Sequence, residues 1–154
     1  MLAVFCPATG WRQVTVTARR TKREFAEQLR LLVEEHFPQA ERIQVVLDNL
    51  NTHTLAALYE VFAPEQARHI ARKLEFHFTP THGSWLNMIE VEWSLLARYC
   101  LRRRLPDIAS VQREADAWAA ERNRTHATVD WRFTARDARE TLKRLYPLTD
   151  HDPP

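Results

Sequence analysis

Glycine is scarce in this sequence, with Gly10 and Gly83 the two examples among 154 residues. Average usage of about 7 % would give about eleven glycines in a chain of this length. Glycine-rich phosphate loops and the G-x-G-x-x-G turn of dinucleotide-binding domains need several residues free to adopt positive φ. The sequence therefore excludes both kinds of nucleotide-binding motif.

Cysteine and long apolar runs are also scarce. Cys6 and Cys100 are too few for a disulfide scaffold and fit a reducing compartment, and both lie in apolar patterns where inert packing is expected. No run reaches about 18 apolar residues, and no basic segment precedes an apolar core near Met1, which argues against a membrane span or a secretory signal. We expect a cytoplasmic protein without membrane contact.

Aspartate is absent from the first 47 residues, since all seven lie at or after Asp48. The net charge is only +2, from 22 basic and 20 acidic residues, but 19 of the basic residues are arginine. The planar guanidinium fork binds phosphate better than a lysine ammonium does. This composition is compatible with a polyanionic partner without requiring one.

The apolar pattern predicts one α/β domain with a helical C-terminal extension. Residues 2–6 and 11–18 are expected to form a hairpin, and a helix with capping-box spacing follows from Thr21 to about Phe37. The remaining expected elements are a strand at 43–47 buried on both faces, helices at 54–62 and 64–74, a strand at 75–79, a helix from Ser84 to about Arg103, and helices capped by Asp107 and Thr134 that end near Arg124 and Leu145.

Asp48 is the strongest single candidate for a functional residue. It follows the apolar strand 43–47 directly, and open α/β sheets place ligands and catalytic groups at the carboxyl ends of their strands. Asp48 and Asn49 are equally compatible with a simple turn, because both residue types favour turns. The position of Asp48 alone does not favour a functional role over a simple turn.

Glu90 is the second candidate, on the helix expected from Ser84. About 100° of rotation per residue places Glu90 roughly 60° from Trp93, beside Asn87 and Ser94 on a polar edge. Glu92 lies roughly 160° away from Glu90, so the two glutamates cannot ligate one metal ion. Either glutamate alone could be a solvated residue on the flank of the buried stripe. That stripe consists of Leu86, Ile89, Trp93, Leu96 and Cys100.

Together, Asp48 and Glu90 suit magnesium-dependent phosphoryl transfer, because hard divalent cations prefer carboxylate oxygens. A competing zinc site would use His53, His77 and His82. That alternative is weaker, because no H-x-x-x-H or C-x-x-C spacing surrounds these histidines.

A run of arginines next to the Glu90 helix could bind phosphates. It consists of Arg98, Arg102, Arg103 and Arg104. The alternative is a solvated helix end, where the helix dipole favours cations in any case. Trp118 and Trp131 are expected in the core, and the C-terminal helices lack a convincing helix-turn-helix signature.

Two motifs make the sequence recognisable: Val-Val-Leu-Asp48-Asn-Leu-Asn-Thr-His53 and His82-Gly-Ser-Trp-Leu-Asn87-Met-Ile-Glu90. In combination they resemble bacterial insertion-sequence transposases of the mariner-like superfamily, which carry a DDE endonuclease domain. Further similar segments extend the resemblance from residue 2 to about residue 147, and they are 10–12, 102–107, 129–133 and 142–147. The 41 residues between Asp48 and Glu90 exceed the usual interval, and we place the extra length in the helix at 64–73.

The resemblance implies a ribonuclease-H-like fold, two Mg²⁺ (or Mn²⁺) ions and an Asp, Asp, Glu triad. Asp48 matches the second aspartate and Glu90 the final glutamate, with Asn49, Asn87 and His53 as supporting residues. It also implies DNA partners, namely transposon ends and target, and is compatible with a homodimer. In the family these acids activate water and then a DNA 3′-hydroxyl for hydrolysis and strand transfer in transposition.

One departure from the family pattern is important. The family's first aspartate lies on a central strand upstream of the hairpin, whereas this chain begins at the hairpin and has no aspartate before Asp48. We therefore expect a ribonuclease-H-like fold lacking its first strand, in a C-terminal transposase segment that is a truncated copy or the partner of an upstream reading-frame product. Residues 1–105 form the partial catalytic domain, 106–147 its helical extension and 148–154 a disordered tail.

The chain alone is expected to cut DNA poorly, because it carries two of the three carboxylates that bind the metal ions. Two other functions stay open. One is a non-catalytic DNA-binding or assembly module that uses the arginines, and the other is a metallohydrolase built on His53 and His82.

Overall fold

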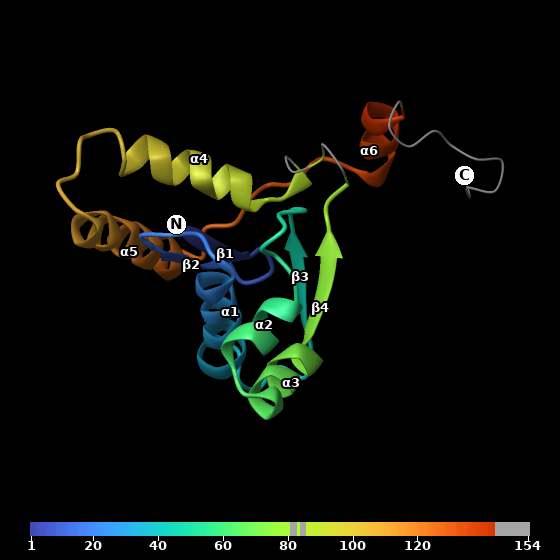
Figure 1. Cartoon of the computed structure of the whole chain (residues 1–154). Coiled ribbons are helices and arrows are strands. Elements are labelled where there is room, and N and C mark those ends of the chain that lie inside the picture. Colours follow the sequence, from blue (N-terminus) through green and yellow to red (C-terminus); the bar gives the residue numbers. More distant parts are fainter. Residues whose placement is uncertain (81–82, 84–85, 144–154) are drawn as a thin grey trace.

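The computed structural model describes residues 1–80, 83 and 86–143, and its elements form a mixed α/β arrangement (Figure 1). In chain order the elements are β1 (Leu2–Cys6), β2 (Trp11–Thr15), α1 (Lys22–Leu31), η1 (Leu32–His36, a π-helical continuation of α1), β3 (Ile43–Leu47), α2 (Ala56–Val61), α3 (Pro64–Lys73), β4 (Leu74–Phe78), α4 (Ile89–Tyr99), α5 (Ile108–Arg124) and α6 (Ala135–Leu142). No helix in the described ranges is both long enough and apolar enough to cross a membrane.

The predicted hairpin is confirmed. β1 and β2 pair antiparallel from Leu2↔Thr15 to Cys6↔Trp11, so β2 ends three residues earlier than expected. The turn closes with a hydrogen bond from Gly10 N to Cys6 O at 2.9 Å, and Gly10 adopts φ +72°. A Cβ at Gly10 would lie 2.9 Å from the carbonyl carbon and oxygen of His126. Glycine is needed here both for the backbone angle and for this close approach.

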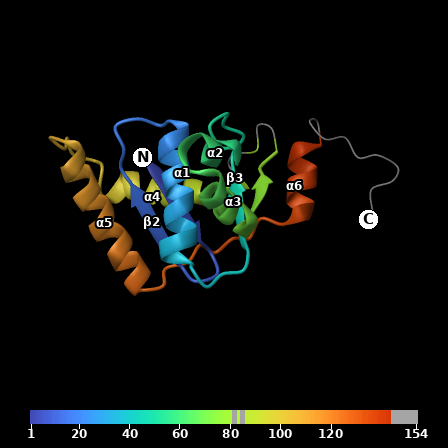
Figure 2. The ribbon, with the colours of Figure 1, turned by 60° about the horizontal axis from the view of Figure 1, so that its bottom comes forward.

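The four strands of the described residues form two separate sheets. β3 and β4 pair parallel from Ile43↔Leu74 to Leu47↔Phe78, while β1 and β2 make the other pair. One hydrophobic core serves both sheets, since Val4 of β1 and Val45 of β3 pack against the same cluster. Helices α1, α2 and α3 supply the opposite side of this core through buried residues such as Leu29, Leu58 and Ile70. In Figure 2 these helices lie together beside the strands.

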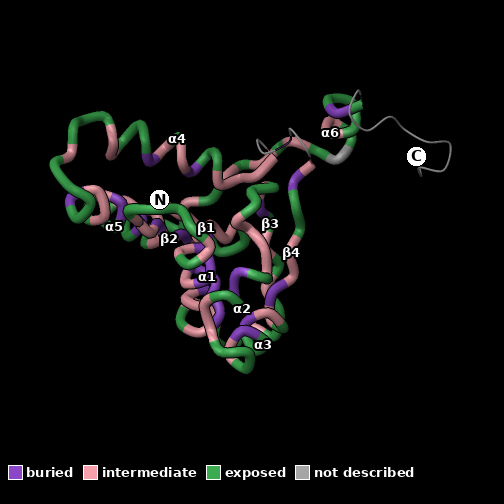
Figure 3. Tube along the Cα trace, in the orientation of Figure 1, coloured by how far each residue is buried: buried purple, intermediate pink, exposed green. Residues whose placement is uncertain are grey.

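A second, smaller core lies on the other face of the hairpin. Leu96 of α4 and Ala115 of α5 are fully buried there against Val14. These helices do not extend over β3, so the prediction that residues 43–47 are buried on both faces is wrong. Gln44 is exposed and Val46 is 54 % exposed. Figure 3 colours buried stretches purple, and they include parts of α1, α2 and α3.

Most expected helices are confirmed with small shifts of their ends. Thr21 caps α1 in a capping box with Glu24, and Asp107 caps α5 by accepting from Ser110 N. The helix expected from Ser84 to about Arg103 is shorter, however, because α4 covers Ile89–Tyr99 only. Its C-cap is Cys100, the last residue of the apolar stripe, and residues 101–103 form bends. Thr134 caps α6, while Ser84 and residues 144–154, including the expected tail, lie outside the described residues.

Helix α5 covers the outer edge of β2 with two side-chain amides. Gln112 donates to Val14 O at 2.9 Å and accepts from Val16 N at 2.7 Å. Asn123 donates to Arg12 O at 2.9 Å and accepts from Arg12 N at 2.8 Å. These amides replace the hydrogen bonds that a neighbouring strand would make, so the hairpin's outer edge is closed.

Candidate active site

Asp48 lies immediately after β3, where the chain turns away from the sheet. Its side chain is 35 % exposed, and its Oδ1 lies 2.6 Å from Nδ1 of His53, although the alignment falls outside hydrogen-bond geometry. The ring of His53 stacks on Phe25 of α1, with ring centres 4.5 Å apart. Packing of the histidine against the core therefore limits the positions that the Asp48 carboxylate can take.

Asn49 connects the ends of the two parallel strands. Its Nδ2 donates to Thr79 O at 2.6 Å, and Thr79 N donates to Leu47 O at 2.9 Å. These two bonds continue the β3–β4 pairing one step past the regular strands. The loop that carries Asp48 is consequently tied to the loop that leads towards α4.

Glu90 occupies the first turn of α4 and is exposed. Asn87 supports the start of this helix, since its Oδ1 accepts from Ile89 N at 3.3 Å. Ser94, one turn later and also exposed, donates from Oγ to the backbone oxygen of Glu90 at 3.0 Å. A carboxylate in a helix's first turn is favoured by the helix dipole and, here, is open to solvent.

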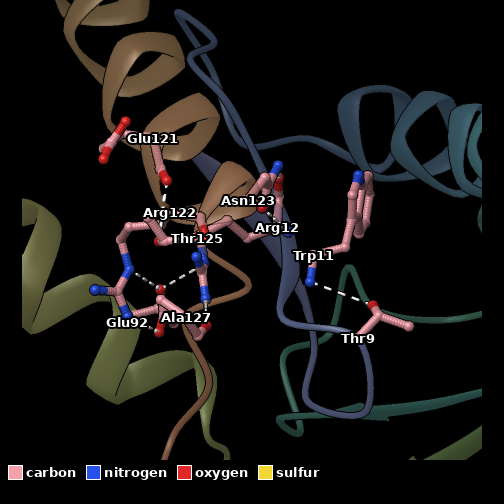
Figure 4. A network of polar contacts seen from close by, with 9 residues as sticks. All are labelled: Thr9, Trp11, Arg12, Glu92, Glu121, Arg122, Asn123, Thr125 and Ala127. Atoms are coloured by element: carbon pink, nitrogen blue, oxygen red, sulfur yellow. Dashed lines mark hydrogen bonds and ion pairs between the residues drawn. The ribbon is translucent and has the colours of Figure 1, made fainter.

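Glu92 has a different environment from Glu90, two residues earlier. Its side chain is 2 % exposed, with Oε2 lying 2.8 Å from Nε of Arg12 and Oε1 lying 3.0 Å from Nη2 of Arg122 (Figure 4). The expectation of a solvated flank residue is therefore wrong for Glu92. We call these three residues, Arg12, Glu92 and Arg122, the arginine clamp. Both carboxylate oxygens of Glu92 are engaged inside it.

The arginine clamp joins three elements that are distant in sequence: β2, α4 and α5. Arg12 is only 1 % exposed in its side chain and also donates to the backbone oxygen of Ala127. Burial lowers the pKa of Arg12, while the Glu92 carboxylate raises it in part. Both arginines also lie over the Trp118 ring, at 5.7 and 5.5 Å from its centre. The clamp fixes the rotation of α4, so that Glu92 faces inward while Glu90 faces solvent.

Sequence reasoning did not identify the arginine clamp. Arg12 was noted only as part of a segment similar to the transposases, and no pattern around Arg122 distinguishes it from the other arginines of α5. The burial of Glu92, which requires a cationic partner, is visible only in the structure.

The acids and histidines of the described residues do not gather into a group of three that could hold a metal ion. His53 packs on Phe25, whereas His77 pairs with Glu75 at 3.1 Å on the exposed face of β4, and His82 lies outside the described residues. His53 packs towards the core on Phe25 whereas His77 is exposed on β4, so among the described residues these two histidines are not grouped for the alternative zinc site. Asp48 and Glu90 offer hard oxygen ligands of the kind that Mg²⁺ takes. In Figure 1 the carboxyl end of β3 and the start of α4 lie on the same, upper side of the molecule.

The expected arginine run is not one continuous helical surface. Arg98 lies in the last turn of α4, but the chain leaves the helix before Arg102, Arg103 and Arg104. All four are exposed, and Arg103 pairs with Glu114 of α5 at 2.5 Å. The local positive charge is therefore smaller than the sequence suggests.

Comparison with known families matches residues 1–112 to the family model described as DDE superfamily endonuclease (DDE_3). The matched segment contains Asp48 and Glu90 and ends within α5. No curated protein and no solved structure matches the chain. Members of this superfamily act on DNA and generally use divalent metal ions. Because the match covers well over half of the sequence, the chain belongs to the DDE superfamily endonucleases, a family of transposase-related nucleases.

Proposed function

We propose that this chain carries the second and third acids, Asp48 and Glu90, of the DDE site of a bacterial insertion-sequence transposase of the mariner-like type. The observation that carries the proposal is the contrast within α4, where Glu92 is engaged by two arginines and Glu90 is exposed. Asp48 adds a carboxylate, 35 % exposed, at the carboxyl end of β3 within the same family-matched segment.

The proposed reaction is phosphodiester hydrolysis followed by strand transfer. Two Mg²⁺ or Mn²⁺ ions, when bound, would supply charge neutralisation at the scissile phosphate and make water or a DNA 3′-hydroxyl a better nucleophile. Asp48 and Glu90 would provide oxygens to hold them. His53 and Asn49 would keep the Asp48 loop in place, and Asn87 would do the same for the start of α4.

The separation of the two sheets supports a missing strand. The outer edge of β2 is closed by α5, whereas the other edge of β1 and the free edge of β3 have no strand partner among residues 1–80, 83 and 86–143. Both sheets nevertheless face one core. We propose that an upstream segment supplies a strand that pairs with both open edges, at about 4.8 Å on each side, and brings the first aspartate.

We propose the following domain limits. Residues 1–105 form a partial ribonuclease-H-like domain, and residues 106–147 are an extension that belongs to it. The hydrogen bonds of Gln112 and Asn123 to β2 support treating α5 as part of that domain.

A plasmid-nicking assay with Mg²⁺ or Mn²⁺ tests the proposal. The chain alone should show little or no nicking, because two carboxylates without the third cannot hold both metal ions at the scissile phosphate. Addition of the upstream polypeptide, with its strand ending in aspartate, should restore nicking. Asp48→Ala or Glu90→Gln should then lower the rate by about 10²–10³-fold, the usual effect of losing one transition-state-stabilising group.

Glu60→Gln is a matched control, because Glu60 is a half-exposed acid that pairs only with Lys22 in the described structure. It should leave nicking unchanged. Nicking by the isolated chain that disappears in Asp48→Ala would contradict the proposed inactivity. Full nicking by a complemented Asp48→Ala complex would contradict the assigned site.

A non-catalytic DNA-binding or assembly module is the second candidate. It is favoured by the exposure of Arg98 in the last turn of α4 and of Arg102 and Arg104, which follow this helix. Its signature would be salt-dependent DNA binding that needs no metal and survives Glu90→Ala. Binding that is lost in Glu90→Ala or on metal chelation would exclude it.

A further inference from the structure

A groove on α3 has no role in the site described above. Its volume is about 360 Å³, and its lining consists entirely of charged residues and histidine. The lining residues are Glu41, Glu65, Arg68, His69, Arg72 and Lys73, and we call this cavity the α3 groove. It lies at the end of β3 and β4 opposite to Asp48, because Glu41 precedes β3 and α3 leads directly into β4 (Figure 1).

The arginines of the α3 groove are exposed and free of ion pairs within the described residues. Arg68 and Arg72 lie one helical turn apart, and neither has an acid within ion-pair distance there. Like charges at this spacing destabilise a helix by about 0.2–0.5 kcal/mol. An anion bound between them would remove that repulsion.

The helix is held firmly enough to present these side chains. Ala67 and Ile70 are fully buried on the opposite side of α3, and Lys73 donates from Nζ to Pro38 O at 2.7 Å. The helix dipole explains cations in the last turn, at Arg72 and Lys73. It does not explain Arg68, one turn earlier, or why the two arginines share a cavity.

The two glutamates limit which anion the groove can take. Arg68, Arg72 and Lys73 face two carboxylates, so these five side chains carry one excess positive charge. A small free anion would gain little from so weak a field. A polyanion that is already bound elsewhere on the molecule would gain affinity from hydrogen bonds to the two guanidinium groups. It would not lose translational and rotational entropy a second time.

The length of β3 gives the spacing between the groove and the candidate active site. Glu41 and Asp48 flank β3 (Ile43–Leu47), and seven residues at about 3.3 Å per residue span at most roughly 23 Å. Base pairs in B-DNA are about 3.4 Å apart, so this distance corresponds to about seven base pairs.

We propose that the α3 groove binds backbone phosphates of the DNA duplex about seven base pairs from the phosphate that lies at Asp48 and Glu90. This inference rests on the proposed function, because it takes DNA bound at that site as given. Arg68 and Arg72 each contact a phosphate, and the contact adds affinity without reading sequence.

Duplex binding measured by fluorescence anisotropy across a range of salt concentrations tests this inference. The probe is a 20-base-pair duplex, and the variant is Arg68→Ala/Arg72→Ala. The slope of log affinity against log salt should become shallower by about two, one for each lost phosphate contact. The matched control is Arg19→Ala/Arg20→Ala, which removes two exposed arginines outside the groove and should keep the slope of the unmodified chain.

A five-base-pair duplex provides the second arm, because it is too short to span both sites. The groove variant should bind the short duplex as the unmodified chain does. Inorganic phosphate is the third probe, and it should compete no better than chloride at equal ionic strength. Saturable competition by phosphate that the groove variant abolishes would assign the groove to a free anion and overturn the duplex proposal.

Failure of this inference can be distinguished from failure of the proposed function. Equal slopes for the groove variant and the unmodified chain overturn the groove contact alone. No duplex binding by the unmodified chain at any salt also overturns the groove contact, whereas the proposed function is decided by nicking in the complemented complex. Full nicking by the complemented Asp48→Ala complex overturns the proposed function, whatever the slopes show.

Discussion

Replacing Glu92 with glutamine tests the arginine clamp directly. The substitution keeps the size of the side chain and one hydrogen-bond acceptor but removes the negative charge. Arg12 and Arg122 would then share an interior site without a counter-ion, and Arg12 is 1 % exposed in its side chain. Glutamine would also place an amide NH₂ against at least one guanidinium.

The expected magnitude follows from the burial of the clamp. Removing one partner of a buried ion pair typically costs about 3–5 kcal/mol, and the remaining acceptor of glutamine places Glu92→Gln near the lower end. For a chain of 154 residues, each kcal/mol lowers Tm by about 2–4 °C. A loss of about 3 kcal/mol therefore predicts a Tm lower by about 6–12 °C.

Glu90→Gln is the matched control for Glu92→Gln, because the same change is made two residues away on the same helix. Glu90 is exposed, so its substitution should change stability by less than about 0.5 kcal/mol. Thermal unfolding followed by circular dichroism and urea unfolding would measure both variants. If Glu90→Gln destabilised the chain more than Glu92→Gln, the rotation of α4 described above would be incorrect.

Three further substitutions test other contacts. Gly10→Ala should destabilise the chain by at least about 1–2 kcal/mol in urea unfolding, since it adds a Cβ at φ +72° and 2.9 Å from the His126 carbonyl. Gly10→Asn should recover part of this loss of stability. An unchanged stability of Gly10→Ala would refute the close approach. Asn123→Leu leaves the backbone N–H and C=O of Arg12 unpaired and should lower the free energy of unfolding by about 1–3 kcal/mol for each group. Hydrogen exchange of the Arg12 amide should become faster. An unchanged exchange rate would contradict the closure of the β2 edge by Asn123. Burial lowers the pKa of His36 below its ordinary 6.5, so the unfolded chain binds more protons just below that pH, and stability should fall as the pH drops through 6.5 towards the folded pKa. His36→Leu should flatten this dependence, and identical pH curves would disprove the assignment.

Local pattern predicted most of the individual elements. The alternation around Trp11, the capping box at Thr21 and the Asp107 cap each act within a few residues, so the hairpin, α1 and the start of α5 were predicted correctly. The end of α4 was not, because the helix was extended to about Arg103 although its apolar stripe stops at Cys100, the C-cap of the observed helix. The assignment of Asp48 and Glu90 as catalytic acids stays a prediction.

The sequence by itself determined the chemistry that this chain can offer: abundant arginine, too little glycine for nucleotide loops, no aspartate before Asp48, and motifs shared with DDE endonucleases. Tertiary structure decided which acid is engaged and which is free. Helical periodicity can place Glu90 and Glu92 on different flanks, but it cannot show that Arg12, 80 residues earlier, and Arg122, 30 residues later, converge on Glu92. Such long-range pairing depends on how β2, α4 and α5 pack, because buried charges need partners that only the folded chain brings together.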